Sequence, residues 1–161
     1  MDQEPSGDRK FIADVHLGRL AKYLRLCGFD TQYEVSMDDK EIIDLSLSEK
    51  RIILTRDKEL LKNKHVIHGY RIVSAKPVEQ LREVMKRFDL KTDLHPFARC
   101  MECNGLLSDV AKEEIKDRLL PGTRDFYDIF KICQVCGKIY WEGSHYERMK
   151  SFIGSLIINN F

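Results

Sequence analysis

Four cysteines arranged in two pairs carry the most specific chemistry in this sequence. Cys100 and Cys103 form one Cys-x-x-Cys pair, and Cys133 and Cys136 form a second pair after 29 intervening residues. Two such pairs supply the four thiolates of a tetrahedral zinc site, and backbone amides in each tight turn stabilise the sulfur charge. A redox pair would precede a helix, whereas the residues after Cys136 predict a ribbon strand, GKIYW. Because four thiolates leave no open position for a substrate, we expect this zinc to be structural.

Carboxylates beside predicted strands form a second group that could do chemistry. Asp14 follows one short apolar run, Asp57 follows another, and Asp39 lies in the first turn of a helix. At the carboxyl edge of a parallel sheet they could converge and share Mg²⁺ or Mn²⁺, which generates hydroxide and stabilises charge on phosphorus. Alternatively, each could simply cap or open a helix, a task for which aspartate is well suited. From the residues alone, both interpretations stay open.

These acids need an α/β scaffold to bring them together, and the apolar pattern predicts one. Short apolar runs alternate with segments of helical spacing, which is the order of a parallel sheet with right-handed crossovers. The predicted strands are 10–14, 30–35, 51–55 and 66–73, and the predicted helices are 17–27, 37–50 and 77–90. We expect Gly28 to end the first helix and Cys27, on its apolar stripe, to be a buried free thiol.

Length and composition allow one ordinary α/β core and a small satellite module. Of the 161 residues, 43% are hydrophobic and 33% are charged, which is typical of a globular protein and excludes a disordered one. We place a flexible start at 1–9, the α/β domain at 10–94, and a ribbon with a C-terminal helix at 95–161. The 27 basic and 26 acidic side chains nearly cancel, so polyanion binding must use local patches.

No segment predicts a membrane span or a secretion signal. No apolar run approaches the roughly 20 residues that cross a bilayer, and residues 1–8 are polar and acidic. We therefore expect a cytoplasmic protein that has no membrane partner.

Four motifs follow one another along the chain in a specific order. They are LGRLA at 17–21, LTRD at 54–57, RCMECN at 99–104 and CQVCGKIYWEGSH at 133–145. Together they resemble the Mut-seven C-terminal ribonuclease family, and the resemblance extends from Phe11 to about Met149. It implies an α/β fold with a PIN-like parallel-sheet domain, helices on both faces of the sheet, and a small zinc ribbon after it.

The resemblance also implies which acids form the site. The residues that match the family's acidic positions are Asp14, Asp39 and Asp57. Glu59, two residues after Asp57, is the nearest match for a fourth acid. Asp38 could replace Asp39 if the helix begins one residue earlier, and Asp44 is a more distant choice. The implied catalytic cofactor is Mg²⁺ or Mn²⁺, and the implied partner is RNA.

Basic side chains near these acids are candidates for RNA contacts. The candidates are Arg19, Lys22, Arg25, Arg56 and Lys58. The first three lie on the helix after Asp14, with the basic side chains on its wetter side, and could hold phosphates there. The alternative is an ordinary solvated helix face. The other two flank Asp57 and could either touch the scissile phosphate or balance the charge of Asp57.

Aromatic residues follow the second cysteine pair. Tyr140, Trp141 and His145 could stack unpaired bases beside the ribbon. Packing of the ribbon onto the first domain explains Trp141 equally well, and for that residue we favour packing. We keep His145 as a candidate RNA contact.

The combined hypothesis is a divalent-metal-dependent ribonuclease that hydrolyses RNA phosphodiester bonds at an acidic PIN-like site. One alternative is an RNA-binding module that has kept the fold and lost activity. Another is a protein-interaction module whose acids are only caps, and this alternative predicts no RNA affinity at low salt. The sequence names no protein partner.

Overall fold

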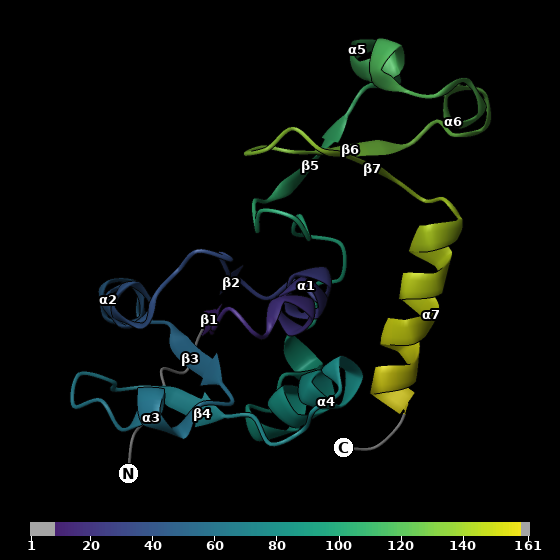
Figure 1. The fold of residues 1–161 in the computed structure, drawn as a ribbon. Coiled ribbons are helices and arrows are strands. Elements are labelled where there is room, and N and C mark those ends of the chain that lie inside the picture. Colours follow the sequence, from purple (N-terminus) through teal and green to yellow (C-terminus); the bar gives the residue numbers. More distant parts are fainter. Residues whose placement is uncertain (1–8, 159–161) are drawn as a thin grey trace.

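The chain forms a parallel-sheet domain, then a ribbon, then a long helix that runs back along the first domain (Figure 1). The structure is a computed structural model, and it describes residues 9–158. The sequence predicts a flexible start at 1–9. Of these residues, 1–8 lie outside the described part of the chain.

Four parallel strands form the sheet of the first domain. In chain order they are β1 Phe11–Ala13, β2 Thr31–Gln32, β3 Ile52–Thr55 and β4 Gly69–Arg71. Across the sheet the order is β2-β1-β3-β4, and every pairing is parallel. The helices that follow these strands are α1 Gly18–Leu26, α2 Asp39–Glu49, α3 Lys58–Leu61 and α4 Pro77–Arg87. Strands and helices alternate, as the sequence predicts.

Helices cover both faces of this sheet because its central strands are apolar on both sides. Phe11 and Leu54 point to one face and lie in the main core with residues of α1 and α4. Ile12 and Ile53 point to the opposite face and pack against α2 and α3. Successive side chains of a strand alternate in this way, and burial of each stabilises the fold by about 1.5–3 kcal/mol. The predicted α/β class, with a parallel sheet between two helical layers, is confirmed (Figure 1).

Some boundaries differ from the predictions for simple reasons. Strand β2 has two residues rather than six, because it lies at the sheet edge and pairs only with β1. Helix α3 is a single turn, too short to leave a periodic pattern in the sequence. Strand β4 covers only the middle of the predicted run 66–73.

The segment between the two modules packs against the end of α1. Gly28 follows this helix with a φ of +95°, and a Cβ there would lie 2.3 Å from the His95 carbonyl oxygen. The His95 N–H donates to the Cys27 carbonyl at 2.9 Å. Glycine therefore both ends the helix and permits this close approach. Cys27 is a buried free thiol, as predicted, and burial raises its pKa to about 12.

The ribbon contains three antiparallel strands and a helical insertion. Its strands are β5 Leu107–Val110, β6 Phe130–Cys133 and β7 Ile139–Trp141, and β6 lies in the middle. The insertion between β5 and β6 contains α5 Lys112–Ile115, η2 Lys116–Arg118 and α6 Pro121–Phe126. Ile115, Leu119 and Phe130 form a small separate core. The predicted strand after the second cysteine pair is β7, which begins two residues later than GKIYW suggests.

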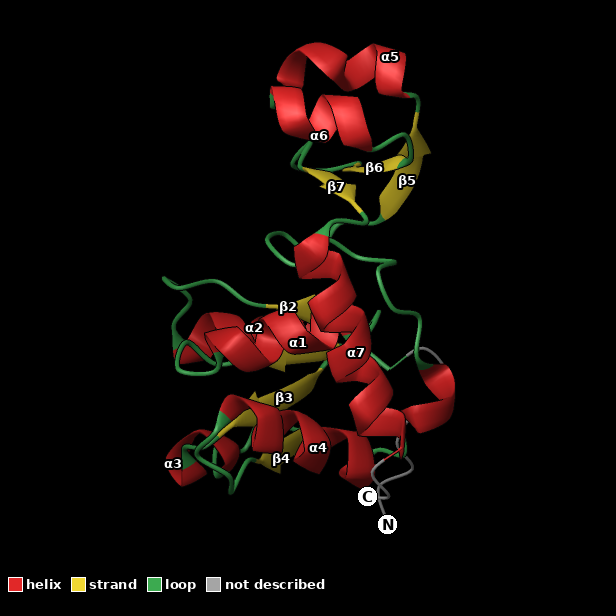
Figure 2. Cartoon of the chain, turned by 90° about the vertical axis from the view of Figure 1, so that its right-hand side faces the viewer, coloured by secondary structure: helices red, strands yellow, loops and turns green. Residues whose placement is uncertain are grey.

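Helix α7, Ser144–Ile158, connects the ribbon back to the first domain (Figure 2). Its residues Ile153 and Leu156 are buried in the main core of the first domain. The Phe152 ring also packs on Tyr23 of α1, with 5.3 Å between ring centroids. The last helix of the chain therefore belongs by its contacts to the first core, although it follows the ribbon in sequence. Within residues 9–158, no helix is both long and apolar enough to span a membrane.

Candidate functional site

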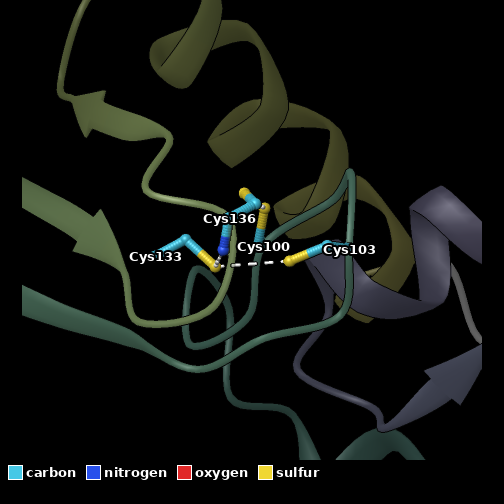
Figure 3. A group of neighbouring side chains, drawn as sticks. All are labelled: Cys100, Cys103, Cys133 and Cys136. Carbon is cyan, nitrogen blue, oxygen red and sulfur yellow. Dashed lines mark hydrogen bonds between the residues drawn. The ribbon is translucent and has the colours of Figure 1, made fainter.

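The four cysteines of the two pairs come together between the modules (Figure 3). All four sulfur atoms lie within 4.8 Å of one another, and this set could hold a metal ion. The Cys103 and Cys133 sulfurs are 3.3 Å apart, and those of Cys100 and Cys136 are 3.7 Å apart. Four sulfurs around zinc at a Zn–S distance of about 2.3 Å would be separated by about 3.8 Å. All four thiols are free, so the spacing suits a metal such as zinc better than a disulfide.

Backbone and side-chain donors surround these sulfurs. The N–H groups of Val135 and Cys136 donate to the Cys133 sulfur at 3.4 and 3.5 Å. Burial would raise the pKa of Cys133, but these amides lower it to about 7 and favour the thiolate. The Tyr140 hydroxyl lies 3.0 Å from the Cys100 sulfur, so it can donate to a ligand atom from outside the metal set. The cysteine pattern in the sequence gives no signal for this role of Tyr140.

A polar cluster joins the first cysteine pair to the edge of the parallel sheet. Asn104, one residue after Cys103, accepts the Thr31 N–H at 3.0 Å and donates to the Asp30 carboxylate at 2.7 Å. The same carboxylate pairs with Arg51 at 2.8 Å and with Arg99 at 3.7 Å. Burial opposes the charge, but Arg51 and Asn104 hold the pKa of Asp30 below its usual value. The metal site is therefore tied to β2 by a charged, hydrogen-bonded network.

The predicted position of Arg25 on the wetter side of its helix is wrong. Its side chain is only 3% exposed, and its guanidinium donates to the carbonyls of Thr31 at 2.9 Å and Met101 at 3.0 Å. Met101 lies between the first two cysteines, so Arg25 joins α1 to the ribbon. The burial of this guanidinium and its two carbonyl partners argue against the expected RNA contact of Arg25.

Two of the predicted acids are connected through one threonine. Asp14, 6% exposed, follows β1, and its carboxylate accepts the His16 N–H at 2.8 Å and the hydroxyl of Thr55. Thr55 ends the neighbouring strand β3, and its hydroxyl oxygen accepts the Asp57 N–H at 3.0 Å. The carboxyl ends of adjacent parallel strands thus bring both acids to one edge of the sheet. Sequence reasoning missed Thr55, although it stands inside the LTRD motif.

Asp57 and Asp38 both cap helices, whereas Asp39 does not. Asp57 precedes α3 and accepts the Glu59 N–H at 2.8 Å. Asp38 precedes α2 and forms a capping box with Glu41, accepting its N–H at 2.8 Å. Asp39 is exposed at the first helical position.

The two less favoured carboxylates, Glu59 and Asp44, have partners of their own. Glu59 pairs with Lys62 at 3.0 Å, and Asp44 pairs with Lys40 at 3.2 Å, both at the surface. Among residues 9–158, the four cysteines are the one group of three or more metal-ligating side chains whose ligand atoms lie close together. The trio of Asp14, Asp39 and Asp57 does not form such a group in that part of the chain.

The other predicted RNA contacts are exposed side chains in three places. Arg19 and Lys22 lie one turn apart on α1, Arg56 and Lys58 flank Asp57, and His145 opens α7. Lys22 pairs with Glu102, which lies between Cys100 and Cys103, at 3.5 Å.

A groove of about 620 Å³ lies between the ribbon sheet, the first cysteine pair and the start of α7. Tyr140, Trp141 and His145 all line it, together with Lys22 of the first domain. Trp141 packs on Phe130 within the ribbon, with 6.3 Å between ring centroids, and is 37% exposed. The sequence favours packing of Trp141 on the first domain. In the structure its ring instead contacts Phe130 of the ribbon.

The geometry defines an α/β protein with a strand-end pair of acids and a four-cysteine metal site. The chain belongs to the Mut7-C RNAse domain family, since the model of that family matches residues 9–153. The resemblance that the motifs indicate is confirmed. No curated protein and no solved structure gives a significant match. The family suggests a ribonuclease role, with RNA as the substrate.

Proposed function

We propose that this protein is a metal-dependent ribonuclease that hydrolyses phosphodiester bonds at the acidic edge of its PIN-like parallel sheet. The observation that carries the proposal is the Asp14–Thr55–Asp57 connection at the ends of β1 and β3. Ligands of open α/β sheets bind at this edge, and the family suggests a ribonuclease role.

The chemistry of the donors suits a hard divalent cation. Each carboxylate oxygen of Asp14 accepts one hydrogen bond, which leaves a lone pair on each. Asp57 uses one oxygen to cap α3 and keeps the other. No salt bridge within residues 9–158 involves Asp14, Asp39 or Asp57, so no basic side chain neutralises them. Mg²⁺ and Mn²⁺ prefer such oxygen ligands.

The three acids would have different duties. Asp14 and Asp57 would hold Mg²⁺ or Mn²⁺. Asp39 would complete the set in preference to Asp38, because Asp39 is the residue that the family resemblance implies and it makes no cap hydrogen bond. A bound cation would supply a water of lowered pKa and stabilise charge on phosphorus. Thr55 would fix the orientation of the Asp14 carboxylate, while Arg56 and Lys58, exposed beside Asp57, would hold the scissile phosphate. Glu59 is a weaker candidate because it already pairs with Lys62.

The four cysteines would hold one structural zinc ion. Four thiolates fill a tetrahedral shell and leave no position for substrate, so this zinc would stabilise the ribbon and its junction with β2. We place the ribbon with its C-terminal helix at 95–161, and within that range α7 packs on the first core.

Cleavage of labelled RNA by the zinc-loaded protein tests the proposal. We expect cleavage of a labelled oligonucleotide only when Mg²⁺ or Mn²⁺ is added, and we expect Asp14→Asn to abolish it while zinc content stays unchanged. RNA binding without cleavage under all these conditions would instead favour the inactive RNA-binding module. Absence of both binding and cleavage at low salt would favour the protein-interaction module.

A further inference from the structure

The groove between the ribbon and α7 is lined by aromatic side chains, none of which is fully buried. Besides His145, four of its lining residues are phenylalanine, tyrosine or tryptophan, namely Phe97, Tyr140, Trp141 and Tyr146. The rings of Phe97 and Tyr146 pack with centroids 4.2 Å apart and form one wall. Trp141 on β7 lies half-exposed in the groove. Aromatic side chains of this kind, held in a hollow, are stacking platforms for flat ligands.

The orientation of the Trp141 ring is fixed by its neighbours. Its indole packs on Phe130, and a Cβ at Gly143 would lie only 2.9 Å from the indole nitrogen. The absence of a side chain at Gly143 therefore lets the indole lie against the turn before α7. A ring held in place by backbone loses little conformational entropy when a ligand stacks on it.

The groove lining carries one more basic than acidic side chain. The groove is lined by Lys22, Lys131 and Lys138, against two acids, Glu102 and Glu142. Of the three lysines, Lys131 pairs with Asp109 outside the lining at 4.0 Å. Glu102 lies between two of these lysines, 3.5 Å from Lys22 and 3.6 Å from Lys138. The Lys138 ammonium also lies over the Tyr140 ring, 5.4 Å from its centroid. Lysines and aromatic rings that line one groove suit a chain that carries both phosphates and flat bases.

Helix α1 connects this groove with the acidic edge of the sheet. Lys22 lines the groove, and Arg19 lies on the same exposed face one turn closer to the start of α1, which follows Asp14. One turn of helix is about 5.4 Å long. A strand of nucleic acid that leaves the groove at Lys22 would therefore pass Arg19 on its way to Asp14.

We propose that the groove lined by Tyr140, Trp141 and Tyr146 binds unpaired nucleotides of single-stranded RNA and guides the strand along α1 to the acids. This inference rests on the proposed ribonuclease function, and it names the substrate class as unpaired rather than duplex RNA. Bases inside an A-form duplex are stacked and cannot enter a groove of this kind.

The fluorescence of Trp141 gives a direct test, because it is the only tryptophan of the chain. The zinc-loaded protein, without Mg²⁺ or Mn²⁺, is titrated with a single-stranded oligouridylate of about 12 nucleotides at about 50 mM salt. We expect saturable quenching that weakens as salt is raised, and no quenching by a duplex of the same length. Equal quenching by both RNAs, or none by the single strand, would overturn the proposal.

Variants that should weaken RNA binding and one that should strengthen it extend this test. Binding is measured by the fluorescence anisotropy of a labelled oligouridylate. Trp141→Ala should weaken binding about tenfold, while Trp141→Phe should keep most of it. Lys138→Gln should weaken binding and flatten its dependence on the logarithm of salt concentration by about 0.7. Glu102→Gln should strengthen binding about fivefold, because it removes the competitor that holds Lys22 and Lys138.

The control is Phe126→Ala, which removes an 82% exposed aromatic side chain of the same module outside the groove and should leave binding unchanged. A mere loss of ribbon structure would not explain tighter binding by Glu102→Gln. Quenching without any Mn²⁺-dependent cleavage would support the groove and reject the nuclease. Cleavage of single-stranded RNA without quenching would support the nuclease and reject the groove.

Discussion

The side-chain amide of Asn104 donates a hydrogen bond to the carboxylate of Asp30 across 2.7 Å. This bond links the first cysteine pair with the residue that precedes the edge strand β2. Asn104 also has a positive φ of 72°, a conformation that asparagine tolerates better than most residues. The same side chain accepts the Thr31 N–H, so both of its polar atoms are used across the junction. The stability of the ribbon should therefore depend on the first domain.

Replacing Asn104 by aspartate should uncouple the two modules. Asn104→Asp keeps the acceptor and the backbone preference but sets a second carboxylate against Asp30, which should cost about 2 kcal/mol. Urea unfolding is followed by Trp141 fluorescence in the ribbon and by far-ultraviolet circular dichroism for the helices. The two transitions should coincide in the wild type, and in the variant the fluorescence transition should move to lower urea. Coincident transitions in both proteins would show that the bond does not couple the modules.

The compensating exchange provides a control for that variant. Asp30→Asn combined with Asn104→Asp restores one amide opposite one carboxylate with the polarity reversed. We expect the double variant to recover part of the lost stability, so that the two changes are not additive. Simple additivity would mean that the two side chains act independently.

Glu83 should make the first domain sensitive to acid. Its carboxylate accepts the Val73 and Ser74 N–H groups and the Tyr70 hydroxyl. Burial would raise its pKa, but the two backbone donors hold the pKa of Glu83 below its ordinary value of 4.5. A depressed folded pKa contributes stability above pH 4.5 that is lost as the pH falls through the folded value.

The difference between wild type and Glu83→Gln isolates this contribution. The free energy of unfolding in urea is measured at several pH values between about 6 and 3. The wild type should be more stable at the upper end, and its advantage should shrink as the pH falls. Glu79→Gln, on the exposed side of the same helix, is the matched control and should show little change. A constant advantage at every pH would contradict the linkage.

Tyr140 should tune the affinity of the metal site. Its hydroxyl is 3.0 Å from the Cys100 sulfur, and burial followed by the hydrogen bond with Cys100 raises the pKa of Tyr140, so it stays a donor. Tyr140→Phe removes the donor and keeps the ring, and zinc affinity should fall about tenfold. Competition with a coloured chelator measures this affinity. Cys133→Ser, which removes a ligand, should instead abolish zinc binding and unfold the ribbon.

The sequence predicted the parts of this protein whose pattern is local. Apolar runs and helical spacing indicate the alternating strands and helices, and the two cysteine pairs indicate the metal site. Arg25 shows where this reasoning fails. Helical periodicity placed it with Arg19 and Lys22, but its guanidinium turns inward to the Met101 carbonyl, a partner 76 residues away.

Long-range polar partners of this kind leave no periodic signal. The Thr55 hydroxyl between two acids and the Asp30 carboxylate between Arg51 and Arg99 exist only because separate segments meet. The return of α7 to the first core is another such case, since residues 144–158 gain their apolar partners from α1. The spacing of apolar residues shows which face of an element is buried. The topology of the fold decides what that face contacts.

Asp57→Asn separates a metal ligand from a helix cap. Asp57 caps α3 by accepting the Glu59 N–H, and asparagine caps equally well through its amide oxygen. Thermal stability should therefore stay within about 0.5 kcal/mol of the wild type. If Asp57 holds Mg²⁺ or Mn²⁺, loss of its charge should lower RNA cleavage by at least about a hundredfold, because the ion that stabilises charge on phosphorus is weakly held.

Asp38→Asn is the matched control, because Asp38 caps α2 in the same way, with one carboxylate oxygen, and is not among the proposed ligands. It should change neither stability nor cleavage. Asp39→Asn, one residue further on, should lower cleavage if the third ligand is Asp39. Mn²⁺-dependent cleavage and thermal midpoint are measured together for the wild type and all three variants. An Asp57→Asn protein that cleaves as fast as the wild type would leave Asp57 as a cap alone, and a loss caused by Asp38→Asn instead of Asp39→Asn would reassign the third ligand.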